Sequence, residues 1–324
     1  MIISSTPLRI SFFGGGSDIP QYYNKKPGMV ISTSINKKIH IAFNRCEPKH
    51  IRAVYSEMEV VDHVDELKHD RIRETLKEFG LADSIEICSF SDVSTRGTGL
   101  GSSSAFTVGL INAMKDYGPV IFNKKDLAEM ACYIEMERCG EPIGKQDQYA
   151  AAYGGFNVIR FDSTGVEVAP IGLGSSSLFS LNNNLLCYST GLSRSASDIL
   201  ADQVNNITTD NRAFDTTSKM VDLAEQALVY LKKGKIDDFG ALMHDAWTFK
   251  KTLSARISTP HIDEMYETAR KAGALGGKIL GAGGGGYMLL YVPRGSHNNV
   301  CEAMMGYKPF NFFFTEQGSA MTYI

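Results

Sequence analysis

The chain has 324 residues, of which 43% are hydrophobic and 21% are charged, and its formal net charge is −3. This length fits two domains, and the composition is that of a soluble globular protein. The absence of a basic excess argues against a nucleic-acid partner, and the absence of a signal peptide or a long apolar run argues against a membrane partner, so we expect a cytoplasmic protein.

The first half of the sequence predicts short strands and three helices. Alternating apolar residues predict strands at 35–43 and 85–90, and a charged stretch at 62–79 predicts an exposed helix. Residues 102–117 are apolar enough to form a buried helix. Asn123 fits the N-cap of a third helix, since apolar residues from Leu127 to Ile134 follow it at helical spacing.

The second half predicts longer helices. Helical patterns cover about 195–207, 216–233, 236–253 and 260–272, and a strand is expected at 287–292. Small and polar residues between 163 and 177 mark the seam between two domains, which we place at 1–170 and 171–324. Six scattered cysteines without a close pair predict reduced thiols. The pattern as a whole predicts a mixed α+β protein in two lobes.

Residues 97–105 read GTGLGSSSA, a glycine-rich stretch that runs directly into the predicted buried helix. A helix N-terminus has unpaired backbone N–H groups and a partial positive charge. Glycines let a ligand come close to that backbone, and serine hydroxyls can contact phosphate or magnesium, so the stretch predicts a phosphate cradle. The alternative is a tight, serine-capped turn. The glycine spacing does not match a dinucleotide fingerprint, which argues against a dehydrogenase.

Two further glycine clusters lie at opposite ends of the chain. Residues 9–18 read RISFFGGGSD, in which Arg9 can hold a phosphate through its charge and forked geometry, and Asp18 can accept hydrogen bonds from substrate hydroxyls. The alternative for these two residues is a surface ion pair and a capping Asp. Residues 281–286 contain five glycines. Glycine is costly to order, so we expect a ligand or another loop to approach this run closely.

An acidic stretch at 134–149 supplies two carboxylates separated by a turn. Glu135 lies near the end of a predicted helix, and Asp147 follows twelve residues later. One carboxylate could hold magnesium, and the other could accept a proton from a hydroxyl. Glu137 and Glu141 are interpreted as ordinary charges at a helix end.

These four stretches, in this order, resemble the GHMP kinase superfamily of galactokinase, homoserine, mevalonate and phosphomevalonate kinases, and the resemblance covers essentially the whole chain. It implies an α+β, two-lobed GHMP kinase fold, in which a ribosomal protein S5 domain 2-like N-terminal lobe packs on a ferredoxin-like C-terminal lobe. It also implies a site between the lobes, with ATP and Mg²⁺ as cofactors.

The resemblance further implies roles for individual residues. Asp147 matches the catalytic base, Arg9 would steady the transferred phosphoryl group, and Ser103 and Glu135 match the magnesium-binding residues. Residues 283–286 would buttress the phosphate loop. The ATP phosphates would be bound by Gly97, Gly99, Leu100, Gly101, Ser102, Ser103 and Ser104. Substrate contacts would come from Gly14, Gly15, Gly16, Ser17, Asp18, Gly283 and Gly284.

Within the superfamily, the chain looks most like the heptose 7-phosphate kinases, on the motifs at 9–18, 144–157 and 188–194. This likeness implies an enzyme that phosphorylates the anomeric C1 hydroxyl of a sugar phosphate, D-glycero-D-manno-heptose 7-phosphate. We expect a monomer or a homodimer, between which the sequence does not decide. The product would be the 1,7-bisphosphate, used in nucleotide-activated heptose synthesis. Galactokinases carry an acidic residue and a histidine where this chain has Gly15 and Gly16, which leaves room for a bulkier sugar.

Three polar residues are candidates to bind the phosphate already present on such a substrate: Lys145, Ser193 and Arg194. Lys145 is also a candidate for catalysis: in an alternative to Asp147 as the base, Asp147 mainly orients the attacking hydroxyl and Lys145 lowers the pKa of that hydroxyl. The alternatives are a fucose-type kinase that acts on an unphosphorylated sugar, and a kinase-like binding module without catalysis.

Overall fold

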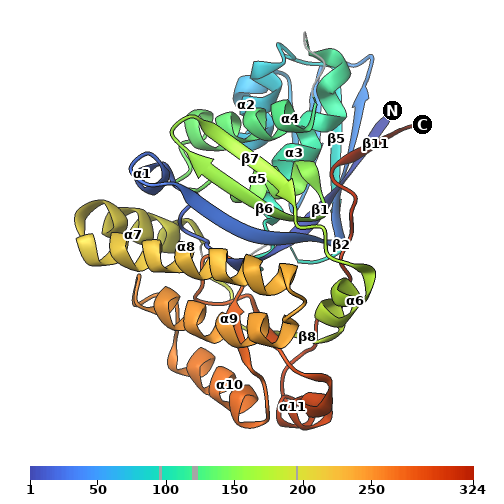
Figure 1. The fold of residues 1–324 in the computed structure, drawn as a ribbon. Helices are drawn as coiled ribbons and strands as arrows, with labels where there is room; N and C mark the ends of the chain where they lie inside the picture. The colour runs from blue at the N-terminus through green and yellow to red at the C-terminus, as the bar shows by residue number, and fades with distance from the viewer. Residues whose placement is uncertain (95–96, 119–122, 195) are drawn as a thin grey trace.

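The computed structural model describes residues 1–94, 97–118, 123–194 and 196–324, and the statements below concern those residues. In Figure 1 the first half of the chain forms a large sheet with helices beside it, and the second half forms a helix-rich layer on that sheet. Within the described ranges, no helix is both long enough and apolar enough to cross a membrane. All six cysteines are free thiols.

The large sheet has eight described strands: β1 (Ile2–Phe13), β2 (Gly28–Arg45), β3 (Ile51–Val54), β4 (Met58–Val61), β5 (Ile85–Ser91), β6 (Phe156–Asp162), β7 (Gly165–Pro170) and β11 (Ala320–Tyr323). Its main path is β11-β1-β2-β5-β3-β4, and β6 pairs with both β2 and β7. Its pairs are antiparallel except for β3 with β5. The expected strands at 35–43 and 85–90 are therefore confirmed, as parts of β2 and β5.

The helices of the first half are α1 (Pro20–Tyr23), α2 (Asp70–Glu78), α3 (Ser102–Met114), α4 (Lys124–Cys132) and α5 (Gln146–Tyr153), with shorter turns η1 (Val64–Glu66), η2 (Lys115–Tyr117) and the π-helical η3 (Tyr133–Arg138). The predicted buried helix is confirmed as α3, and Asn123 caps α4 in a capping box with Asp126. The predicted exposed helix at 62–79 is partly wrong. It splits into η1 and α2, and Ile72 and Leu76 are fully buried because α2 packs on α3.

The second half builds a three-stranded antiparallel sheet in the order β8 (Leu185–Ser189), β10 (Tyr287–Tyr291), β9 (Gly276–Ile279). Around it lie α6 (Ser175–Asn183), α7 (Ala196–Thr209), α8 (Asn211–Lys232), α9 (Ile236–Lys251), α10 (Pro260–Lys271), η4 (Arg294–Ser296) and α11 (His297–Ala303). The four predicted helices and the predicted strand are confirmed. Helix α8 begins at Asn211, earlier than expected, because the Asp210 side chain caps it.

Strand β1 is the element on which both halves of the chain pack. Its residues 2–5 alternate between buried and half-buried, whereas residues 6–13 are all buried, as expected for a strand that is covered on both faces. Helices α3 and α5 of the first half and α8 and α9 of the second half all contact it. The rings of Phe13 and Phe239 meet at 5.0 Å across this junction. Residues near the end of β1 therefore lie where the two halves meet.

The end of the chain returns to the first sheet. Strand β11 pairs antiparallel with β1, from Ile2 opposite Tyr323 to Ser5 opposite Ala320. Figure 1 shows the two chain ends side by side at this edge. Part of the chain beyond residue 171 thus completes the sheet formed by the residues before it.

Candidate active site

A cavity of about 310 Å³ opens where the two halves of the chain meet. Its walls come from segments that are far apart in the sequence: the end of β1 with the glycine turn after it, helix α2, the loop before α3 with its first turn, the segment before α5, helix α7, the end of α9 and the glycine run at 281–282. Among the residues predicted from sequence, the cavity is lined by Arg9, Gly15, Gly16, Asp18, Gly97, Gly99, Gly101, Ser102, Ser103, Ser104 and Asp147. The fold thus brings together residues that the sequence only suggested were related.

The loop at 97–101 has the geometry of a phosphate cradle. Gly97, Gly99 and Gly101 adopt φ angles of +65°, +72° and +75°, a left-handed conformation that side chains disfavour. Gly101 is the N-cap of α3, so the N–H groups of the first helical turn, at 102–104, have no partner within the helix. That turn lines the cavity, which gives the cavity unpaired donors and a partial positive charge.

The glycine run at 281–286 supports this loop by backbone contact. A Cβ atom on Gly281 would lie 2.5 Å from the Gly99 Cα atom, and one on Gly286 would lie 2.7 Å from the Gly97 carbonyl oxygen. The expectation of close approach is therefore confirmed at Gly281 and Gly286. Gly283 and Gly284 pack instead against Ile257 and Ile199, outside the cavity.

Replacing Gly99 by Ala is expected to disrupt the cradle. Its Cβ would lie 2.2 Å from the Leu280 carbonyl oxygen, a backbone atom that cannot move aside. Overpacking and left-handed strain together should destabilise the protein by about 2–5 kcal/mol and weaken ATP binding. Gly80→Ala is the matched control, because Gly80 has φ +65° with open space around it. Chemical denaturation and ATP titration of both variants would test this, and equal losses would contradict a role for the contact.

The three serines of the cradle have different partners. The Ser104 hydroxyl donates to a carboxylate oxygen of Glu135 at 2.7 Å, and the Ser102 hydroxyl shares a 3.2 Å hydrogen bond with Thr98. The Ser103 hydroxyl forms no hydrogen bond with another described residue, although its residue lines the cavity and is exposed. Ser103 is therefore the serine whose hydroxyl is free to meet a ligand.

Arg9 and Asp147 form a forked ion pair at the cavity wall. Arg9 donates from Nε and from Nη2 to the two Asp147 carboxylate oxygens, both at 2.7 Å. Arg9 comes from β1 and is buried, whereas the Asp147 side chain on α5 remains 22% exposed. The pair fixes the Asp147 carboxylate while leaving part of it open to the cavity.

Asp18 is held by the glycine turn and by the segment before α5. Its carboxylate accepts hydrogen bonds from the backbone N–H groups of Gly16 at 2.9 Å and Gln146 at 3.3 Å. Burial, with the nearby charge of Asp147 as a smaller contribution, raises the pKa of Asp18. A Cβ on Gly144 would lie 2.0 Å from the Asp18 carboxylate, so this approach requires glycine. Asp18 is therefore a fixed hydrogen-bond acceptor in the cavity wall.

Gly14 and Ser17, predicted as substrate contacts, shape this turn from outside the cavity. The Ser17 hydroxyl donates to the Gly14 carbonyl oxygen at 2.8 Å and accepts from the Met29 N–H at 3.0 Å. A Cβ on Gly14 would collide with the Met29 carbonyl. In the structure, both residues hold the turn against β2.

Glu135 lies behind the cradle, fully buried with 0% of its side chain exposed. One carboxylate oxygen accepts from Arg71 Nε and the Thr107 hydroxyl, both at 2.9 Å, and the other accepts from the Ser104 hydroxyl at 2.7 Å and Gln148 Nε2 at 2.6 Å. With four donors on two oxygens, the carboxylate is saturated.

Of the two predicted magnesium ligands, only one therefore has an oxygen atom free to bind a metal in this structure. Ser103 offers a free hydroxyl at the cradle, but a bond from Glu135 to magnesium would require one of its four donors to withdraw. The described ranges contain no group of three or more His, Cys, Asp or Glu side chains that could hold a metal ion. Magnesium accordingly enters the reaction below only as part of the substrate MgATP.

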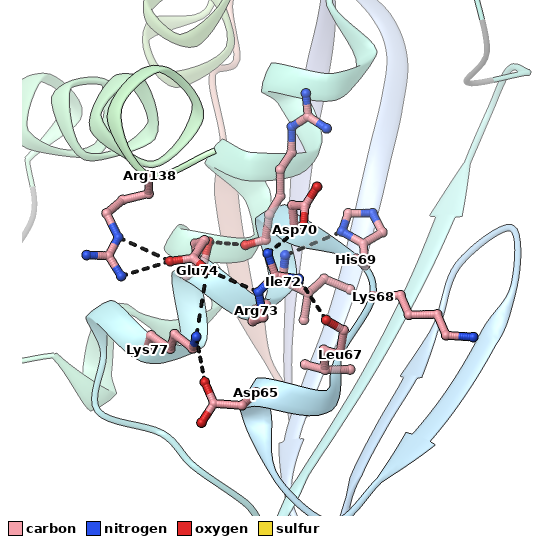
Figure 2. Close-up of polar contacts among 12 residues, drawn as sticks. Asp65, Leu67, Lys68, His69, Asp70, Ile72, Arg73, Glu74, Lys77 and Arg138 are labelled. Carbon is pink, nitrogen blue, oxygen red and sulfur yellow. Dashed lines mark hydrogen bonds and ion pairs between the residues drawn. The ribbon is translucent and has the colours of Figure 1, made fainter. Parts of the chain in front are cut away.

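Arg71 lines the cavity and bridges two carboxylates, that of Glu135 and that of Glu141, each at 2.9 Å. Its helix α2 is fixed by a second set of ion pairs. Figure 2 shows Glu74 contacted by Arg138 from η3, at 2.8 Å, and by Arg73 and Lys77 from α2 itself. Burial alone would raise the pKa of Glu74, but the bonds from Arg138 and Arg73 lower it overall. The carboxylate of Glu74 thus ties α2 to η3, the turn that carries Glu135.

Other predicted site residues lie outside the cavity. The Lys145 ammonium lies 5.2 Å from the centre of the Tyr23 ring and lines a different hollow, so a catalytic role for it would require the side chain to turn. Ser193 and Arg194 are exposed and abut Gly97 at the edge of the cradle. Leu100 is buried, and its backbone carbonyl oxygen accepts a hydrogen bond from the backbone N–H of Arg9 at 3.0 Å.

Three charged residues of the cavity were not singled out from the sequence: Arg71, Glu141 and Lys250. Arg71 lies within the stretch expected to be an exposed helix, and Glu141 was interpreted as an ordinary helix-end charge. Lys250 lies near the end of a predicted helix, where a lysine is the expected residue type. No local pattern distinguishes any of them from a surface charge.

A second cavity, of about 650 Å³, lies on the other side of the same serines. It shares Arg71, Ser102 and Ser103 with the first. Aromatic side chains make up much of its wall, and they are those of Tyr55, His69, Phe90 and Phe106. The start of α3 thus stands between a charged cavity and an aromatic one.

Residues 68–155 match the GHMP kinases N terminal domain, and residues 227–307 match the region described as GHMP kinases C terminal. The chain is 30% identical to D-glycero-alpha-D-manno-heptose 7-phosphate kinase of Campylobacter jejuni, over 98% of this chain and 97% of that one. It is 26% identical to the bifunctional fucokinase/GDP-fucose pyrophosphorylase of Arabidopsis thaliana, over 88% of this chain but 29% of that one. The crystal structure of a D-glycero-D-manno-heptose 1-phosphate kinase from Bacteroides thetaiotaomicron superposes with a TM-score of 0.82 at 23% identity, covering 100% of this chain and 99% of the other.

Proposed function

Because this chain belongs to the GHMP kinase family and is an ATP-dependent sugar kinase, we propose that it phosphorylates the anomeric hydroxyl of D-glycero-D-manno-heptose 7-phosphate. The product would be the 1,7-bisphosphate. The observation that carries the proposal is the arrangement of the cavity, in which the cradle and the Arg9–Asp147 pair face the same space. The identity of 30% to a heptose 7-phosphate kinase along the full chain supports the choice of sugar.

In this proposal, ATP spans both cavities. The phosphates lie along the first turn of α3, where N–H groups at 102–104 and the free Ser103 hydroxyl can meet them. The adenine ring enters the second cavity, where Tyr55 and Phe106 offer apolar surface. Since the two cavities share Ser102 and Ser103, one nucleotide can occupy both.

The sugar binds on the other side of the first cavity, with its anomeric hydroxyl at Asp147. Asp147 takes the hydroxyl proton as the oxygen bonds to the γ-phosphorus, and the bond from that phosphorus to the bridging oxygen breaks, releasing ADP. Arg9, which holds the Asp147 carboxylate in position, also lines the cavity and stabilises charge on the phosphoryl oxygens. Phosphoryl transfer depends mostly on positioning and electrostatics, which these fixed groups supply.

The glycine turn leaves space for a sugar larger than a hexose. Nothing lies within 4 Å of where a Cβ on Gly16 would be, and a Cβ on Gly15 would have only the Gln146 side chain near it, at 3.7 Å. Both glycines line the cavity beside Asp18, which can accept hydrogen bonds from sugar hydroxyls. This space supports a seven-carbon sugar.

The substrate is tested by measuring ADP release from MgATP with four sugars in parallel: D-glycero-D-manno-heptose 7-phosphate, mannose, fucose and galactose. We expect turnover with the heptose phosphate alone, and phosphorus NMR should show a new anomeric phosphate. Turnover of fucose instead would favour the second candidate, a fucose-type sugar-1-kinase, which the likeness to the Arabidopsis fucokinase supports. That result would contradict the heptose assignment.

A further inference from the structure

Three cationic side chains line the first cavity, and two of them are neutralised by carboxylates. Arg9 is paired with Asp147, and Arg71 is paired with Glu141 and with Glu135 behind it. The third is Lys250, from the last turn of α9. No carboxylate of a described residue lies within ion-pairing distance of its ammonium.

The ammonium of Lys250 has unused hydrogen-bonding capacity. It donates to the Gly281 carbonyl oxygen at 2.6 Å, and no second acceptor is found among the described residues. An ammonium has three N–H donors, so two remain available. The backbone of Gly281 lies against Gly99, so this bond places Lys250 beside the phosphate loop.

A lysine in this position is costly to the ligand-free protein. The residue is 5% exposed, and burial, together with the charge of Arg9, lowers the pKa of Lys250 to about 8 despite the opposing effects of Asp18 and Asp147. A buried cation without an ionic partner is unfavourable unless it meets an anion. The cavity that it lines is where an anion would enter.

We propose that Lys250 binds the oxygens of a phosphate monoester or phosphoryl group inside this cavity. Two sources supply that chemistry: the γ-phosphate of ATP, and the phosphate carried by the sugar. The second source rests on the function proposed above, whereas the first depends only on the chain being an ATP-dependent kinase.

Lys278 is the matched control. It is as buried as Lys250, at 5% exposed, and comes from the same half of the chain, on β9. Its ammonium donates to the carbonyl oxygens of Ser11 at 2.8 Å and Phe12 at 3.2 Å, and it does not line the cavity. Lys278→Met removes an equally buried lysine whose bonds are internal to the protein.

The test compares Lys250→Met and Lys278→Met with the unaltered protein by calorimetric titration. The probes are a non-hydrolysable ATP analogue, ADP, D-glycero-D-manno-heptose 7-phosphate, mannose and inorganic phosphate. Loss of one charge-assisted hydrogen bond should weaken phosphate binding by roughly 10- to 100-fold. We expect Lys250→Met to bind inorganic phosphate more weakly by this factor. We expect the same loss for the ATP analogue, for D-glycero-D-manno-heptose 7-phosphate, or for both.

The pattern of losses identifies the source of the phosphate. A loss for the ATP analogue but not for ADP assigns Lys250 to the γ-phosphate. A loss for the heptose phosphate, with the ATP analogue unchanged, assigns it to the substrate phosphate. Unchanged affinity for all phosphate probes overturns the proposal, as does an equal loss for ADP and mannose, which would indicate a merely structural role.

If heptose phosphate fails to bind even the unaltered protein, the proposed substrate is wrong. The titrations with inorganic phosphate and the ATP analogue still decide the role of Lys250.

A pH profile gives an independent readout. Since the pKa of Lys250 is about 8, phosphate binding above pH 8 must draw a proton onto the lysine, so affinity should fall as pH rises beyond 8. Lys250→Met should lose this dependence. The charged groups facing Lys250 are Arg9, Asp18, Asp147 and Lys278, and all four are retained in Lys250→Met. A profile that persists in this variant would overturn the proposal.

Discussion

Replacing Asp147 by Asn is expected to lower kcat by roughly 10²–10⁴-fold, the usual effect of removing a general base. Asparagine keeps the shape of the side chain but cannot accept the proton of the anomeric hydroxyl. It also accepts only one of the two hydrogen bonds that Arg9 donates, so Arg9 loses its ionic partner. Steady-state kinetics of Asp147→Asn, with ATP binding measured separately, would test the prediction.

The control for Asp147→Asn is Glu225→Gln. The two carboxylate oxygens of Glu225 also accept hydrogen bonds from one arginine, from Nη1 and Nη2 of Arg160. This pair is exposed and does not line the cavity. Its loss should leave kcat unchanged.

Near-normal turnover of Asp147→Asn with intact ATP binding would exclude Asp147 as the general base. If Asp147 is the base, residual turnover of Asp147→Asn should rise with pH as hydroxide takes over; a flat profile would favour a role in orienting the hydroxyl.

Replacing Arg71 by Met should destabilise the protein by about 3–5 kcal/mol, because it leaves the Glu135 carboxylate buried without its cation. Three neutral donors remain on that carboxylate, from Ser104, Thr107 and Gln148. They offset only part of the loss, since they carry no charge. The free energy of unfolding, from chemical denaturation, is the measurement.

Two further variants sharpen this test. In Arg71→Met combined with Glu135→Gln, no buried charge is left without a partner, so much of the lost stability should return. Arg52→Met removes an arginine from an exposed pair with Glu86 and should cost less than about 1 kcal/mol. If Arg71→Met is no less stable than Arg52→Met, the buried pair does not hold η3 and α2 in place.

The cradle could be predicted from sequence because its signal is local. Gly97, Gly99 and Gly101 are read directly from the chain, and their left-handed φ angles explain why glycine is needed at each. The approach of the run at 281–286 was also predicted, from its glycine content. The sequence did not predict which glycines make the contact, because the contact of Gly281 with Gly99 depends on how two distant loops meet.

Lys145 shows how sequence proximity misleads. It precedes Asp147 by two residues, which suggested that both face the substrate. Lys145 is the N-cap of α5 and Asp147 is in its first turn, and residues two apart on a helix point in different directions. Arg71 and Lys250 are the opposite case, since their side chains reach the cavity from helices that carry no local signal of a site.

The return of β11 to β1 has a consequence for how the chain is made. One edge of β1 at residues 2–5 pairs with β2 and the other with residues 320–323, so during synthesis the second edge stays unpaired until residues 320–323 have left the ribosome. An open strand edge is a template for pairing with another chain. Strand β1 is thus open to pairing with another chain until residues 320–323 reach it.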